Sequence, residues 1–150
     1  MIISDVSVTL WKWEGIPPTR YGRAVATPDE CQLGLLKIQT DTGLEGHAFL
    51  GTSYAPADWD AELITKRFKP ILLGKDPFAR EQINEILFRI ARGQAIRTIG
   101  AVDVALWDLA GKSTDLPIYR LLGSYRDSIP AYASSQMLPS PEAYAEQALE

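Results

Sequence analysis

The stretch Ile99-Gly-Ala-Val-Asp-Val-Ala-Leu-Trp-Asp-Leu-Ala-Gly-Lys-Ser-Thr-Asp-Leu-Pro-Ile-Tyr-Arg-Leu-Leu-Gly123 decides how this chain is interpreted. Val102, Leu106 and Leu109 recur at helical spacing and predict the buried stripe of a helix from about Arg97 to Lys112. Leu116-Pro117 ends the helical pattern, and the residues up to Gly123 are expected to form a turn.

Two aspartates, Asp103 and Asp108, interrupt this apolar helix. Five residues apart, they point about 140° away from each other and are poorly placed to act as a paired acid and base. We interpret both as structural residues. Asp108 is expected to pair with Lys112, four residues further on, and Asp103 to cap or pair with a neighbouring element.

The N-terminal third has the pattern of a three-stranded meander. Residues 2–10 alternate and predict a half-buried strand, with Ile2, Val6, Val8 and Leu10 on one face. Strands at 32–40 and 44–50 flank the turn signal Asp41-Thr42-Gly43 and form a hairpin. Residues 14–30, which are rich in proline and glycine, and residues 51–57 are expected to be loops.

Helical patterns follow the meander. Asp58 is the expected cap of a helix with apolar positions at Trp59, Leu63, Phe68 and Leu72. Asp76-Pro77 resembles a cap followed by proline at the first helical position, and it predicts a helix with apolar positions at Ile83, Ile86, Leu87 and Ile90.

The pattern changes again after Gly123. Residues 129–134 predict a short strand, and Ser140-Pro141 predicts the start of another helix. Three strands followed by three helices describe an α+β unit, whereas the last strand and helix have the form of a first β/α unit.

The composition excludes several classes of function. The 150 residues carry a net charge of −4 and no cluster of basic residues, which argues against a nucleic-acid partner. Neither an apolar run of about 18 residues nor a signal-peptide pattern is found, so we expect no membrane partner and a cytoplasmic protein. Cys31 is the only cysteine and His47 the only histidine, which leaves no internal disulfide and no cysteine-based zinc site.

Polar side chains in the two loops are candidates for ligand binding. Arg20, Tyr21 and Arg23 lie in the first loop and Tyr54 in the second. Arginine grips a carboxylate at two points, and tyrosine adds a hydroxyl group and an apolar wall, so this set suits a small hydroxylated anion. Scattered charges on a solvated loop would give the same pattern.

Other candidates stand on predicted strands. Histidine is the side-chain type suited to proton transfer near neutrality, so His47 could act as a general base. No partner at a diagnostic spacing accompanies it, which favours a structural or loop-anchoring role. Ser134, Ser135 and Gln136 follow the strand predicted at 129–134, where a barrel would place its active site; an ordinary connecting loop is the alternative.

Several motifs, in order, resemble the N-terminal region of the enolase superfamily, of the mandelate racemase and muconate lactonizing enzyme type. They are Lys37-Ile-Gln-Thr-Asp-Thr-Gly-Leu-Glu-Gly46, Gly100 to Lys112, Leu116-Pro-Ile-Tyr-Arg-Leu-Leu-Gly123 and Pro130-Ala-Tyr-Ala-Ser-Ser135. The chain departs from the resemblance at Gly46-His47-Ala48-Phe49, where many relatives carry Gly-Trp-Gly-Glu.

The resemblance implies an α+β capping domain over residues 1–124, followed over 125–150 by the first strand and the start of the first helix of a (β/α)8 barrel. It further implies a Mg²⁺-dependent enzyme that removes the proton α to a carboxylate. The catalytic residues and metal ligands would lie on later barrel strands, with none in this chain. Two capping loops, around 14–30 and 47–57, would close over the substrate.

By this resemblance the candidate substrate-binding residues are Arg20, Tyr21, Arg23, His47, Tyr54, Ser135 and Gln136. The expected substrate is a small carboxylate, either a hydroxylated acid or a sugar acid, and the expected activity is dehydration. Racemisation or epimerisation of 2-hydroxy acids and cycloisomerisation are alternatives within the superfamily, and a homo-oligomer is expected. An alternative of another class is a non-catalytic α+β binding module.

Overall fold

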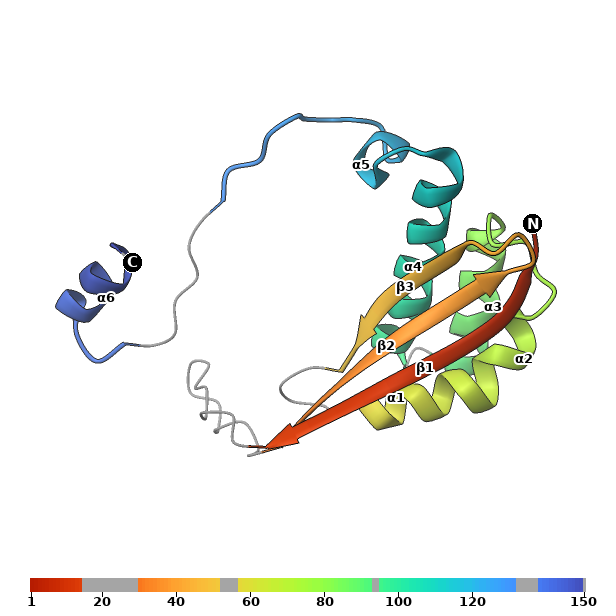
Figure 1. Cartoon of the computed structure of the whole chain (residues 1–150), viewed down its shortest axis with the longest axis horizontal. Helices are drawn as coiled ribbons and strands as arrows, with labels where there is room; N and C mark the ends of the chain where they lie inside the picture. Colours follow the sequence, from red (N-terminus) through yellow and green to blue (C-terminus); the bar gives the residue numbers. More distant parts are fainter. Residues whose placement is uncertain (15–29, 52–56, 93–94, 132–137, 150) are drawn as a thin grey trace.

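A three-stranded antiparallel sheet in the order β1-β2-β3 precedes the helices of this chain (Figure 1). The computed structural model describes residues 1–14, 30–51, 57–92, 95–131 and 138–149. The strands are β1 (Ile3–Glu14), β2 (Glu30–Thr40) and β3 (Glu45–Leu50). The predicted meander is therefore confirmed. Glu14 pairs with Glu30, so the sheet extends to both edges of the segment expected to be a loop.

The inward and outward alternation of side chains in β1 differs from the prediction at the first residues of the strand. A register shift between Ile3 and Asp5 places Ile3, not Ile2, in the core: Ile3 is 1% exposed and Ile2 46%. A bulge inserts one residue and inverts the alternation on its far side, which a strict period of two cannot anticipate. Val6 is buried as expected, whereas Leu10 is exposed.

The helices follow in chain order. They are α1 (Ala57–Leu63), the π-helical turn η1 (Ile64–Phe68), α2 (Lys69–Leu72), α3 (Arg80–Ala91), α4 (Ile96–Thr114), α5 (Ile118–Leu121) and α6 (Pro141–Gln147). Pro70 lies in α2, and a proline ring clashes with the carbonyl four residues earlier, which accounts for the wider turn of η1 just before it. None of the helices in the described ranges is long and apolar enough to cross a bilayer.

One hydrophobic core joins the sheet to the helices. Its largest fully buried side chains come from the strands, from the α1–α2 region and from helices α3 and α4. The predicted stripe Val102, Leu106 and Leu109 is buried at 1%, 1% and 0% exposure, which confirms that part of the α4 prediction. The helix itself is longer than expected at both ends.

The prediction for α1 was wrong in two respects. The helix begins at Ala57, one residue before the expected cap Asp58, and Trp59 is 51% exposed. A Cβ on Gly34 would lie only 3.2 Å from the Cβ of Ala57, so α1 approaches the sheet too closely for an indole to fit beneath it. The helix therefore presents Ala57 and Ala61 to the core, followed by Ile64 at the start of η1.

The α3 prediction also needs correction at its start. Asp76 accepts a hydrogen bond at Oδ1 from the backbone N–H of Phe78 (3.0 Å) and forms a turn, so the helix begins only at Arg80. Ile83 and Leu87 are buried as expected, whereas Ile90 is exposed.

The C-terminal part agrees only partly with the predictions. The expected turn after Pro117 contains the short helix α5. Of the strand predicted at 129–134, residues 129–131 are not in a strand, and residues 132–134 lie outside the described residues. A strand needs a neighbour to satisfy its backbone, and the sheet of the described residues contains only β1 to β3. Helix α6 begins as predicted, with Ser140 Oγ accepting from the N–H of Ala143 (3.3 Å). The boundary between capping domain and barrel at residue 124 stays a prediction.

Gly46 provides a direct test of the packing of α4 on β3. A Cβ at this position would lie 2.1 Å from the carbonyl oxygen of Ala105. Gly46→Ala should therefore lower the free energy of unfolding by about 3 kcal/mol or more, because the backbone itself has to move. Urea denaturation monitored by circular dichroism measures this change.

Gly100→Ala is the matched control, since a Cβ there meets nothing within 4 Å. This substitution in the middle of α4 should raise the free energy of unfolding by about 0.5–1 kcal/mol through helix propensity. Equal effects of the two substitutions would contradict the close contact at Gly46.

Candidate functional site

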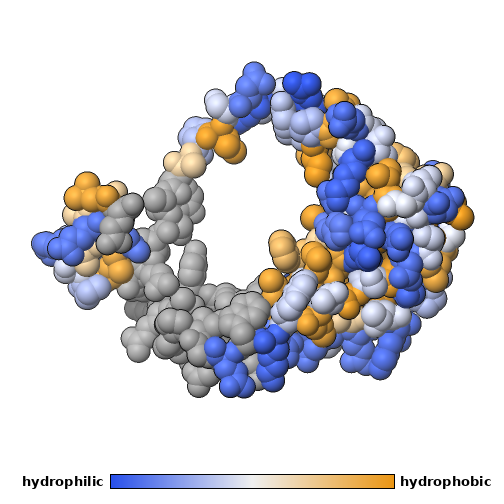
Figure 2. All heavy atoms as spheres, in the orientation of Figure 1, coloured by the Kyte–Doolittle hydropathy of each residue, from blue (hydrophilic) through white to orange (hydrophobic). Residues whose placement is uncertain are grey.

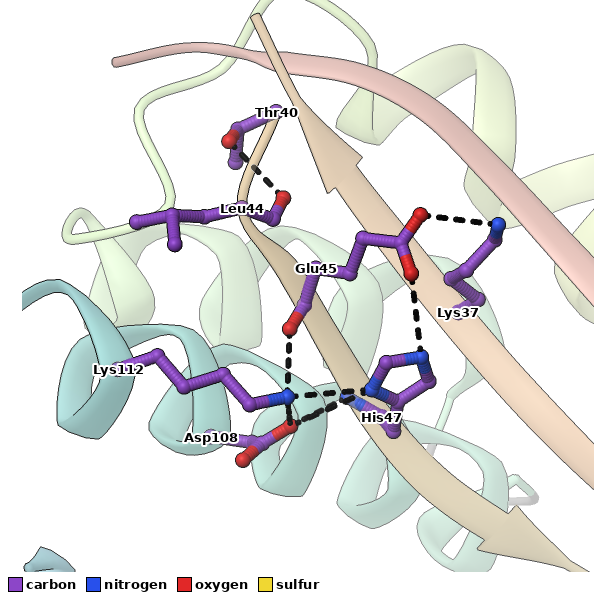
Figure 3. Close-up of polar contacts among 7 residues, drawn as sticks. All are labelled: Lys37, Thr40, Leu44, Glu45, His47, Asp108 and Lys112. Carbon is purple, nitrogen blue, oxygen red and sulfur yellow. Dashed lines mark hydrogen bonds and ion pairs between the residues drawn. The ribbon is translucent and has the colours of Figure 1, made fainter. Parts of the chain in front are cut away.

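A cluster of charged side chains lies where α4 meets the outer edge of β3 (Figure 3). We call Glu45, His47, Asp108 and Lys112 the β3–α4 clamp. Glu45 and His47 belong to β3, and Asp108 and Lys112 are one turn apart on α4. Lys37, the neighbour of His47 on β2, joins the cluster through an ion pair with Glu45 (3.0 Å).

The clamp satisfies backbone groups that β3 cannot pair with another strand. The N–H of His47 donates to Asp108 Oδ2 (2.8 Å), and the carbonyl of Glu45 accepts from Lys112 Nζ (2.7 Å). In an antiparallel edge strand alternate residues turn both backbone groups away from the neighbour, and 45 and 47 are two such residues. Asp108 and Lys112 therefore complete the sheet edge.

The side chains of the clamp also contact one another. Asp108 pairs with Lys112 (2.7 Å), which confirms the i, i+4 pair expected from the sequence. Lys112 Nζ lies 3.2 Å from Nδ1 of His47, and Glu45 Oε2 lies 3.6 Å from Nε2. Because an ammonium group can only donate, Nδ1 acts as acceptor toward Lys112, and we infer that a neutral ring carries its proton on Nε2, toward Glu45.

These contacts agree with the structural interpretation of His47. Its backbone and both ring nitrogens are engaged by residues of the clamp. The substrate-binding role of His47 stays a prediction.

Asp103 does not join the clamp. It lies on another side of α4, where burial raises the pKa of its carboxyl group, opposed by the positive charge of Arg80 and assisted by the negative charge of Glu81. Arg80 itself stacks over the ring of Trp107 at 3.7 Å. The two aspartates thus have separate surroundings, as their spacing predicted.

A buried ion pair escaped the sequence analysis. Asp60 on α1 is 0% exposed; its Oδ2 accepts from Arg97 (2.6 Å) and its Oδ1 from the hydroxyl of Thr98 (2.5 Å). It fixes the start of α4 to α1. The only sign of this ion pair in the sequence was an aspartate next to Ala61, a position in the apolar part of α1. The partners of Asp60 lie 37 and 38 residues away in the chain, beyond the reach of a local pattern.

Most predicted site residues lie outside the described residues: Arg20, Tyr21, Arg23, Tyr54, Ser135 and Gln136. The structure does describe where their segments begin and end. Glu14 faces Glu30, and Gly34 faces Leu50, so the segments 15–29 and 52–56 both leave the same end of the sheet. The two predicted binding loops therefore start from the same end of the sheet.

Apolar side chains surround that end of the sheet. Trp11 is 44% exposed and Phe49 70% exposed, although both stand on strands. Figure 2 shows orange, apolar atoms beside the grey atoms of the undescribed segments.

A metal centre is not formed by the described residues. They contain no group of three or more histidine, cysteine, aspartate or glutamate side chains that could hold a metal ion. A magnesium site of the expected kind would need carboxylate ligands from elsewhere.

The fold is thus that of an α+β domain with two adjoining connections at one end of its sheet. Residues 5–123 match the family described as mandelate racemase / muconate lactonizing enzyme, N-terminal domain. The chain belongs to this family of the enolase superfamily, which confirms the resemblance noted in the sequence.

Named relatives and solved structures agree with this assignment. The chain is 32% identical to an arabinonate dehydratase of Saccharolobus solfataricus over 138 residues, which is 87% of this chain and 37% of the relative. A D-glucarate dehydratase of Agrobacterium tumefaciens, solved with magnesium, is 35% identical with a TM-score of 0.71, over 91% of this chain and 36% of that one.

A dipeptide epimerase of Enterococcus faecalis V583, solved with Mg and the dipeptide L-Leu-L-Tyr, gives a TM-score of 0.81 at 26% identity, over 99% of this chain and 42% of that one. The chain spans less than half the length of each of these relatives.

Asp108→Ala tests the clamp. It removes the acceptor for the N–H of His47 and the partner of Lys112, so we expect the free energy of unfolding to fall by about 2 kcal/mol. Thermal and urea unfolding of the 150-residue chain measure the change.

Glu62→Ala is a matched control, because Glu62 forms an i, i+4 pair with Lys66 at the same 2.7 Å on an open helix surface. Its effect should be far smaller than that of Asp108→Ala. If both substitutions act equally, the backbone bond to His47 contributes nothing to the fold.

Proposed function

We propose that this chain is the N-terminal part of a magnesium-dependent enolase-superfamily enzyme that abstracts the proton α to a carboxylate, with a sugar acid dehydrated as the substrate. Residues 1–124 would form the capping domain and residues 125–150 the first strand and the start of the first helix of the barrel. Family membership over residues 5–123 carries the proposal. The dehydratase names of relatives from two organisms support the reaction class.

The contribution of this chain would be to cover the substrate rather than to perform the chemistry. The segments 15–29 and 52–56 leave one end of the sheet together, so both could reach a ligand held against that end. In this role Arg20 and Arg23 would grip the carboxylate, while Tyr21 and Tyr54 would supply hydroxyl groups and apolar walls. His47, Ser135 and Gln136 are further proposed contacts.

Magnesium, when bound, would stabilise the negative charge that develops on the substrate carboxylate. The described residues contain no group of side chains that could hold the magnesium ion. We therefore propose that its ligands belong to other parts of the enzyme. Homo-oligomerisation and a cytoplasmic location belong to the same proposal.

Epimerisation is the second candidate, favoured by the likeness to the dipeptide epimerase. Both reactions begin with loss of an α-proton, and they differ in the step that follows. A dehydratase expels a β-hydroxyl group as water, whereas an epimerase returns a proton to the opposite face.

The first experiment is the intact mass of the protein from its natural source, followed by an assay of that protein. With Mg²⁺ in deuterated water, a library of sugar acids should yield 2-keto-3-deoxy acids that absorb after reaction with semicarbazide. Deuterium at the α-carbon of recovered acid, without a keto product, would favour the epimerase. A native mass near 16.6 kDa, with neither product nor exchange, would contradict the proposal and favour the binding module.

Arg20→Ala in the active enzyme tests the covering role. Loss of a charge-assisted contact to the substrate carboxylate should raise KM by about tenfold to a hundredfold. Arg89→Ala is the control, because Arg89 is an exposed cation paired with Glu85 on α3. An unchanged KM for Arg20→Ala would remove this residue from the substrate site.

A further inference from the structure

A groove of about 450 Å³ lies between the α1–η1 region and the junction of α3 with α4. Helices α1, α3 and α4 are labelled in Figure 1. Leu63, Ile90 and Ala91 give it apolar walls. Two arginines, Arg67 and Arg92, line it as well, and the exposed indole of Trp59 lies at its border with a smaller neighbouring hollow of about 300 Å³. A volume of this size is typical of a site for one small molecule.

The charge of the groove is positive and locally uncompensated. None of the described residues that line the groove carries a carboxylate. Within the described part of the chain, Arg67 and Arg92 form no ion pair, whereas the nearby Lys66 is paired with Glu62 (2.7 Å) and Arg97 with Asp60 (2.6 Å). This cationic site occurs in a chain whose net charge is −4. Among the described residues, Glu62 carries a carboxylate that lines the neighbouring hollow, and this carboxylate is already paired with Lys66.

The backbone of Arg92 gives independent support. Arg92 ends α3 with φ +47° and ψ +37°, a left-handed conformation that costs a side-chain-bearing residue more than glycine. The next residue in the sequence is Gly93, so a glycine was available one position away. An arginine held in this conformation beside a groove suggests that its side chain has a use there.

One wall of the groove, α1, is joined to the start of α4 by hydrogen bonds. Asp60, fully buried on α1, binds both Arg97 and Thr98 at the start of α4. This contact fixes α1 relative to α4, and the groove lies between α1 and the residues that lead into α4. The α1 wall of the groove thus has a fixed support, which lowers the entropic cost of binding against it.

We propose that this groove binds a small organic carboxylate with an aromatic or branched apolar body. The two guanidinium groups take the carboxylate, the apolar walls take the body, and the indole of Trp59 packs against it. The limited volume and apolar walls favour a small molecule over an acidic peptide. The inference is independent of the proposed catalytic function.

Benzoate is the probe, titrated into the full ¹⁵N-labelled 150-residue chain. The indole N–H signal of Trp59, assigned with the Trp59→Phe variant, should shift with a Kd of about 1 mM, as expected for so small a ligand. Benzamide has the same shape without the charge, and acetate has the charge without the ring. Both should bind at least tenfold more weakly than benzoate.

Arg67→Gln and Arg92→Gly should each weaken benzoate binding at least tenfold. Arg92→Gly should also leave the melting temperature unchanged or higher, because glycine relieves the left-handed strain, so lost binding cannot be ascribed to unfolding. Arg89→Gln, outside the groove, should bind as the unchanged chain does. The proposal is overturned if benzamide binds as well as benzoate, if Arg92→Gly retains the affinity, or if a Glu-rich peptide without aromatic residues shifts Trp59 at lower concentration than benzoate.

Discussion

The close approach of α4 to β3 is the contact on which the rest of the structure depends. Gly46 has no side chain, and a Cβ there would lie 2.1 Å from the carbonyl oxygen of Ala105. Only this approach brings Asp108 and Lys112 within hydrogen-bonding distance of the backbone of β3. The edge strand therefore gains partners for groups that would otherwise stay open to pairing with another chain.

Helix α4 supports two further parts of the molecule at its two ends. Near its start, Arg97 and Thr98 hold α1 through the buried Asp60. In its second half, Asp108 and Lys112 hold β3. Since the segment 52–56 runs from β3 to α1, both of its ends are fixed to the same helix. A substitution on α4 can therefore shift β3 or α1, the two elements that this connection joins.

The sequence predicted features that depend on neighbours a few residues apart. The hairpin, the buried stripe of α4 and the pair Asp108–Lys112 all belong to this group, and the structure confirms them. Each requires only the period of a strand or helix. The same local patterns indicated an α+β unit, and the family resemblance added that this unit is a capping domain.

Features that depend on distant packing could not be predicted in this way. Trp59 was expected in the core because it is apolar, but the contact of α1 with Gly34 admits only a small residue such as Ala57. The bond from the N–H of His47 to Asp108 joins residues 61 positions apart, and no spacing rule connects them. The bulge after Ile3 similarly follows from the pairing of β1 with β2.

The clamp also constrains any chemistry that could involve His47. Lys112 and Asp108 both lie on the Nδ1 side of the ring, and both also bind the backbone of β3. Nδ1 is thus tied to contacts that the sheet edge requires. A ligand approaching this histidine would have to meet Nε2 and replace Glu45, which can turn to Lys37 without loss of its own partner. The ring therefore meets Lys112 and Asp108 on its Nδ1 side and Glu45 on its Nε2 side, and only the Nε2 side could take part in the substrate contact proposed for His47.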